Sequence, residues 1–131
     1  MKPSILIVDD NEQVLVSLAT WLGALFPGCS FFTARSGEEA AEIISDIKPV
    51  VVLMDICMPG WSGFTTIREI RRAYEALDVI VLTAHDDNHY RREAEEAGAR
   101  AYVLKDEAPR KLPTLLKQAL CQWIFETTRQ A

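Results

Sequence analysis

The chain has 131 residues, of which 49% are hydrophobic and 25% are charged, a composition typical of one globular domain with a hydrophobic core. Its formal net charge of −5 argues against a nucleic-acid-binding surface, which is normally basic, so we expect no direct nucleic-acid contact by this domain. No apolar run approaches the roughly 20 residues of a membrane-spanning helix, and we expect no membrane partner.

Short apolar runs alternate with amphipathic segments along the chain. The run 4–8 is the first predicted strand, and Asp10 or Asn11 can cap the helix that follows it and stops at residues 26–28. The helix predicted over 86–97 has few apolar residues to bury, so we expect it to be the most mobile element. The predicted strands are 4–8, 29–34, 50–54, 78–83 and 100–104. A helix is predicted after each strand: the first ends at 25, the next three are 37–47, 63–77 and 86–97, and the last begins at about 108.

This alternation of five strands with five helices predicts an α/β fold. We expect a doubly wound five-stranded parallel sheet with helices on both faces and right-handed crossovers. For five such units the flavodoxin-like strand order 2-1-3-4-5 is common. One domain is predicted over residues 1–125, and residues 126–131 form a polar tail or the start of a linker to an output domain not in this chain.

The three cysteines give no sign of a disulfide framework or a zinc site. Cys29, Cys57 and Cys121 are odd in number and lack the C-x-x-C spacing. The apolar run near the N-terminus is too short for a signal peptide and no small-residue cleavage site follows it. We therefore expect reduced thiols in a cytoplasmic protein.

Polar residues stand where the predicted strands end. Residues 50–54 are a continuous apolar run that leads directly to Asp55, and Pro59-Gly60 cannot continue the strand. In a parallel sheet the carboxyl ends of all strands lie at one edge, which is where ligands of open α/β sheets bind. The residues that follow or end the other strands at this edge are Asp9, Asp10, Thr83 and Lys105.

These residue types together predict phosphoryl chemistry. Carboxylates about 4 Å apart repel by about 4 kcal/mol at an effective dielectric constant of about 20, so either one is protonated or a cation is bound. Hard oxygen ligands with open positions suit Mg²⁺, and Cys57 can add only its backbone carbonyl. Asp55 is a candidate nucleophile of the kind that forms an aspartyl phosphate. Lys105 can neutralise the transferring oxygens, and the Thr83 hydroxyl can donate to one of them.

Other phosphate sites fit the sequence poorly. The residues after the first strand lack the G-x-G-x-x-G pattern of a dinucleotide site, and the P-loop pattern is absent from the chain. A phosphatase that resembles haloacid dehalogenases needs a second acid two residues after Asp55, where this chain has Cys57. His85, two residues past Thr83, either lines the site or is a solvated loop histidine.

Four motifs together resemble the receiver domain of response regulators in two-component signalling. The resemblance covers the chain from Ile5 to about Ile124. It rests on Asp9-Asp10, Asp55-Ile56-Cys57-Met58-Pro59 with Gly63, Leu82-Thr83-Ala84, and Ala97-Gly98-Ala99 with Tyr102 and Lys105.

The resemblance implies a CheY-like fold with the order 2-1-3-4-5 and a phosphoryl switch on Asp55. A histidine kinase or a phosphotransfer protein would supply the phosphoryl group. Mg²⁺, or Mn²⁺ in its place, would bind Asp10 and Asp55 directly and Asp9 through water, with the Cys57 backbone carbonyl. Thr83, the Ala84 backbone, Tyr102 and Lys105 would then respond to the phosphoryl group. The surface of the fourth helix, fifth strand and fifth helix would change toward an output or a homodimer.

This sequence departs from the family pattern after its lysine. Proline usually follows, often through a cis bond, whereas Lys105 is followed by Asp106, and because a cis bond there would cost ~3 kcal/mol we expect it to be trans. Lys105-Asp106 also resembles receivers fused to LuxR-type DNA-binding domains, which makes transcription regulation one output. Cys57 and His85 occupy positions that tune phosphoryl lifetime in the family.

The main hypothesis is therefore a switch that phosphorylates and dephosphorylates itself, not a turnover enzyme. Two alternatives are a phosphorylation-independent interaction module and a small phosphotransferase or phosphatase.

Overall fold

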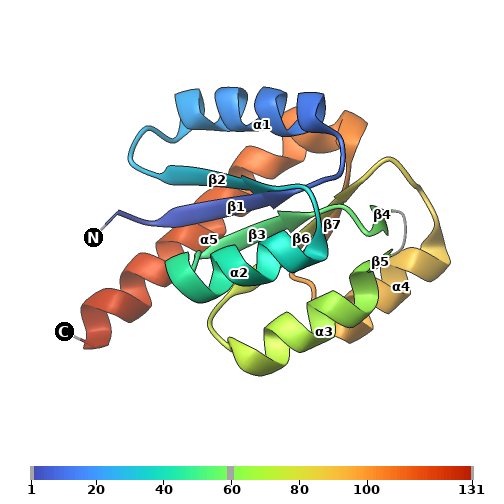
Figure 1. Ribbon diagram of the computed structural model, residues 1–131. Coiled ribbons are helices and arrows are strands. Elements are labelled where there is room, and N and C mark those ends of the chain that lie inside the picture. Colours follow the sequence, from blue (N-terminus) through green and yellow to red (C-terminus); the bar gives the residue numbers. More distant parts are fainter. Residues whose placement is uncertain (1, 59–60, 131) are drawn as a thin grey trace.

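A five-stranded parallel sheet forms the centre of the computed structural model, which describes residues 2–58 and 61–130 (Figure 1). The strand order is β2-β1-β3-β6-β7, and every neighbouring pair is parallel. This confirms the predicted order 2-1-3-4-5. Pro59 and Gly60, predicted to end the third strand segment, lie outside the described residues. The sheet strands are β1 (Ser4–Val8), β2 (Ser30–Ala34), β3 (Val51–Met54), β6 (Asp78–Thr83) and β7 (Ala101–Leu104).

Helices cover both faces of the sheet (Figure 1). Residues that alternate along each strand divide the core into two clusters, as expected for strands buried on both sides. One cluster packs against α1 and α5, and the other packs against α2, α3 and α4. The helices are α1 (Glu12–Leu25), α2 (Gly37–Ile47), α3 (Gly63–Ala73), α4 (Asn88–Ala97) and α5 (Ala108–Gln130), with a 3₁₀ turn η1 (Lys105–Glu107) before α5.

Side-chain caps fix where the helices start. Asn11, one of the two predicted candidates, caps α1 by accepting a hydrogen bond of 3.2 Å from the Val14 N–H. Ser36 and Ser62 cap α2 and α3 in the same way. Gly98 ends α4 with φ of +106°, the left-handed conformation that favours glycine.

Two helix boundaries and one additional strand pair differ from the sequence prediction. Helix α3 ends at Ala73 and not at 77, because the Arg71 guanidinium donates to the carbonyls of Glu75 and Leu77 and stabilises a turn there. Helix α4 begins at Asn88 and not at 86, because Asp87 caps it through the His89 N–H at 2.8 Å. A short antiparallel pair, β4 (Cys57–Met58) with β5 (Trp61–Ser62), follows β3 and was not predicted.

Helix α5 also runs further than its polar end suggested and remains helical to Gln130. Among the described residues no helix combines the length and apolarity that crossing a membrane requires.

Candidate functional site

Two buried acids mark the carboxyl edge of the central strands. Asp9 follows β1, Asp55 follows β3, and both side chains are buried. Each continues the sheet by one backbone hydrogen bond, from the Asp9 N–H to the Ala34 carbonyl and from the Asp55 N–H to the Val8 carbonyl, both 3.1 Å. The sequence places these acids at neighbouring strand ends, and the sheet order brings them together.

In each of these two carboxylates, one oxygen accepts a backbone hydrogen bond and the other faces Lys105. The Asn11 N–H donates to Oδ1 of Asp9 and the Cys57 N–H donates to Oδ1 of Asp55, each at 2.9 Å. The second oxygens both accept from Lys105, whose Nζ lies 2.8 Å from Asp9 Oδ2 and 3.1 Å from Asp55 Oδ2. The three side chains therefore form one ion-paired cluster, assembled from β1, β3 and the end of β7.

The electrostatics of this cluster favour a charged lysine. Burial lowers the pKa of Lys105, but its hydrogen bonds with Asp9 and Asp55 outweigh that effect and leave the pKa above its usual value. The positive charge of the partly buried Lys105 ammonium group is thus stabilised by the carboxylates of Asp9 and Asp55.

The remaining predicted metal ligands are Asp10 and the Cys57 backbone carbonyl. Asp10 is exposed. In the described part of the chain, no three Asp, Glu, His or Cys side chains are grouped tightly enough to hold a metal ion. The donor chemistry nevertheless fits Mg²⁺ or Mn²⁺, which prefer carboxylate oxygens. Asp9 and Asp55 each direct one such oxygen at the same cation, which in this structure is the Lys105 ammonium group. The Cys57 thiol has a raised pKa, mainly because of burial and then the Asp55 charge, although a hydrogen bond with Thr83 opposes this.

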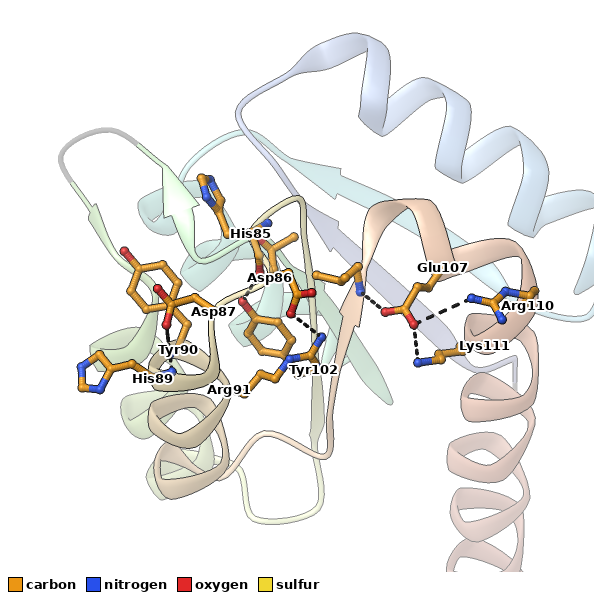
Figure 2. A network of polar contacts seen from close by, with 12 residues as sticks. His85, Asp86, Asp87, His89, Tyr90, Arg91, Tyr102, Glu107, Arg110 and Lys111 are labelled. Atoms are coloured by element: carbon orange, nitrogen blue, oxygen red, sulfur yellow. Dashed lines mark hydrogen bonds and ion pairs between the residues drawn. The ribbon is translucent and has the colours of Figure 1, made fainter.

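Thr83 and Tyr102 are linked through the backbone of His85. Thr83 is fully buried at the end of β6, and its hydroxyl oxygen accepts from the His85 N–H at 3.3 Å. The Tyr102 hydroxyl donates to the His85 carbonyl at 2.6 Å (Figure 2). Burial raises the pKa of Tyr102 to about 12. The His85 side chain and Ala84 are exposed, so His85 joins this network by its main chain.

Sequence reasoning missed two charged residues, Arg91 of α4 and Glu107 of η1 (Figure 2). The Arg91 guanidinium of α4 lies 4.7 Å from the centre of the Tyr102 ring and pairs with Asp86 at 3.2 Å. Glu107 of η1 accepts from the Leu104 N–H at 3.4 Å and pairs with Lys111 of α5. The spacing of Glu107 to Lys111, four residues on one helical face, was the only available signal for this second pair.

A model of the family "Response regulator receiver domain" matches residues 5–117. The chain belongs to the response regulator receiver domains. As a receiver domain it is a signalling switch in a two-component system and not a turnover enzyme, and its family typically uses Mg²⁺ and implies a histidine kinase as partner.

Two relatives are transcriptional or response regulators. This receiver domain is 36% identical over 105 residues to the transcriptional activator protein ExaE of Pseudomonas putida. The aligned residues cover 80% of this chain and 49% of ExaE. It is 34% identical over 120 residues to the response regulator MprA of Mycolicibacterium vanbaalenii, which covers 92% of this chain and 51% of MprA. The chain thus spans about half the length of these curated relatives.

Solved structures agree with the fold. The BeF3-activated receiver domain of Klebsiella pneumoniae RstA is 31% identical with a TM-score of 0.82, over 89% of this chain and 97% of that one. A LuxR-family two-component response regulator from Aurantimonas is 28% identical with a TM-score of 0.84, over 93% of this chain and 87% of that one. The signal receiver domain of an HD domain-containing protein from Pseudomonas fluorescens Pf-5 is 26% identical with a TM-score of 0.86, over 98% and 93%.

One predicted departure is visible in this receiver domain. No peptide bond in residues 2–58 and 61–130 is cis, so Lys105-Asp106 is trans as expected. Lys105 and Asp106 instead begin the 3₁₀ turn η1 that leads into α5.

Proposed function

We propose that Asp55 of this receiver accepts a phosphoryl group from the phosphohistidine of a histidine kinase or a phosphotransfer protein. One observation carries the proposal: the buried Asp55 carboxylate is fixed at Oδ1 by the Cys57 N–H and faces Lys105 with Oδ2. A carboxylate held in this way is oriented for attack, and the lysine beside it offsets the charge that gathers on transferring oxygens.

The transfer breaks one bond and forms another. An oxygen of Asp55 attacks the phosphorus, the P–N bond to the donor imidazole breaks, and the imidazole leaves with a proton taken from solvent. Mg²⁺ or Mn²⁺, when bound by Asp9, Asp10, Asp55 and the Cys57 backbone carbonyl, supplies further positive charge to the phosphoryl oxygens. Lys105 remains the cation that this chain itself provides.

Phosphorylation of Asp55 changes the conformation of the groups linked through His85. Thr83 and the Ala84 backbone bind the phosphoryl group, and Tyr102 moves with them, which alters the surface of α4, β7 and α5. That surface acts on an output domain or a downstream protein, or pairs in a homodimer. ExaE and the LuxR-family regulators support transcription as the output, through a fused DNA-binding domain. Cys57 and His85, next to the phosphoryl site, tune its lifetime.

Intact mass after incubation with Mg²⁺ and acetyl phosphate tests the nucleophile. The wild type is expected to gain one phosphoryl group and Asp55→Asn none, because an amide oxygen is a far weaker nucleophile than a carboxylate. Asp46→Asn, which removes an exposed acid on α2, is the matched control and should behave like the wild type. Phosphorylation of Asp55→Asn would show that another residue is the acceptor, and no gain by folded wild type would favour a phosphorylation-independent interaction module.

A further inference from the structure

The turn after β7 is held by a side chain, because the strand lies at the edge of the sheet. Leu104, the last residue of β7, pairs with Thr83 of β6 on its inner side. Within residues 2–58 and 61–130 no strand lies on its outer side, and its N–H donates to Oε1 of Glu107 at 3.4 Å. A partly buried backbone donor at a strand edge is stabilised by such a partner, and here the same chain supplies it three residues later.

The backbone of Lys105 is therefore enclosed between two hydrogen bonds. On one side is the bond from the Leu104 N–H to Glu107, and on the other the Ala108 N–H donates to the Lys105 carbonyl. No proline ring restricts the chain at 106, so the 3₁₀ turn depends on its backbone hydrogen bonds, and the Glu107 side chain adds a further contact at its start.

Helix α5 in turn holds the Glu107 carboxylate. Its Oε2 pairs with Lys111 and lies 3.9 Å from Arg110, both in the first turn of α5 (Figure 2). The Glu107 side chain is only 17% exposed, whereas Lys111 and Arg110 reach into solvent. The carboxylate thus connects the end of β7 to α5 across the residue that carries the functional ammonium group.

We propose that Glu107 is a positioning residue for Lys105, an inference that rests on the proposed function. The long lysine side chain must place one ammonium group within hydrogen-bond distance of both Asp9 and Asp55. A turn that is free to shift by about 1 Å would spread that group over many positions and weaken its action on the phosphoryl oxygens. Glu107 restricts the turn and so preserves this double contact.

Glu107→Ala tests the inference against a charge-matched control. We expect its phosphorylation rate constant with acetyl phosphate and Mg²⁺ to fall about fivefold, the change that corresponds to one ordinary hydrogen bond. Asp106→Ala removes one acid from the same turn, at an exposed side chain for which the described part of the chain offers no partner, and should keep the wild-type rate. In a Lys105→Ala background, Glu107→Ala should cause no further loss, since the group that it positions is gone.

A measurement on the unphosphorylated protein separates this inference from the proposed function. The side-chain ammonium resonance of Lys105, identified by its absence in Lys105→Ala, should broaden or disappear in Glu107→Ala and persist in Asp106→Ala. If the wild type gains no phosphoryl group, the proposed function fails, while this resonance still decides the role of Glu107. An unchanged resonance in Glu107→Ala, or an equal further loss of rate in the Lys105→Ala background at an unchanged melting temperature, would overturn the inference.

Discussion

Lys105 makes it possible to bury two acids at the edge of one sheet. An unpaired carboxylate at the depth of Asp9 or Asp55 costs several kcal/mol, and the ammonium group between them offsets that cost for both. The backbone N–H groups of Asn11 and Cys57 satisfy the remaining oxygens. The same arrangement that stabilises the fold leaves one oxygen of Asp55 directed at the Lys105 ammonium group, as the proposed phosphoryl transfer would use.

Glu107 gives this receiver a distinct dependence of stability on pH. Its pKa lies below the ordinary value of 4.5, mainly because Lys111 donates a hydrogen bond to the carboxylate, although slight desolvation opposes the shift. A lowered pKa in the folded state means that the stabilisation is fully present above about pH 5 and is lost as the pH falls through the folded pKa. Glu107→Gln should therefore unfold in less urea than the wild type at pH 7, and the difference should shrink below pH 4.5.

Urea unfolding from pH 7 to pH 3 checks this expectation. Asp46→Asn, an exposed acid on α2, serves as the control and should follow the wild type across the range. A difference between Glu107→Gln and the wild type that stays constant down to pH 3 would show that the ionised carboxylate contributes nothing there.

Residues at strand ends could be predicted, and residues on helix surfaces could not. Asp9, Asp55 and Lys105 follow apolar runs, and the edge of a parallel sheet collects whatever follows such runs. Arg91 and Glu107 act through side chains that reach between elements. Their partners depend on how α4 and α5 pack on β7, which hydrophobic periodicity does not specify.

At the scale of elements, Gly63 lets the first residue of α3 lie directly against Ile56. A Cβ atom at Gly63 would lie 2.6 Å from Cα of Ile56 and 2.9 Å from its Cβ, so part of the clash is with backbone directly after Asp55. Gly63→Ala should therefore lower the free energy of unfolding by about 2 kcal/mol or more, because the loop must shift. It should also slow phosphorylation, since the same shift displaces Asp55.

Gly23 offers the matched control for that substitution. It lies within α1, and a Cβ there would meet no heavy atom within 4 Å. Gly23→Ala should raise the free energy of unfolding by about 0.5–1 kcal/mol through helix propensity alone. Urea unfolding of both variants measures the contrast, and equal effects at the two positions would contradict the close approach of Gly63 to Ile56.

Strand positions followed from the sequence more closely than helix ends. The continuous apolar runs of β1, β3 and β6 are typical of strands buried on both faces of a sheet. Their observed extents match the predicted ranges to within one residue. Helix α3 ends early because Arg71 caps the turn beyond it, and β4 pairs with β5 through only two residues each. Both features depend on contacts that no periodic pattern encodes.

At the scale of the whole molecule, α5 is a core element along only part of its length. Its buried side chains reach from Ala108 to Leu120 and form one wall of the core under β1, β3 and β6. Beyond that point the helix continues, but Ile124 and Phe125 are 54% and 65% exposed. The stabilising contacts of the domain therefore end well before the helix does.

This division predicts how truncation affects stability. A chain that ends at Phe125 should keep its free energy of unfolding within about 0.5 kcal/mol, because residues 126–129 are exposed. A chain that ends at Gln118 loses the buried Ala119 and Leu120 together with the half-buried Trp123, and should lose more than about 2 kcal/mol. Urea unfolding of the two truncated chains beside the full chain measures this. A large loss in the longer chain would mean that the last turns of α5 stabilise the domain, and the predicted limit at residue 125 would be wrong.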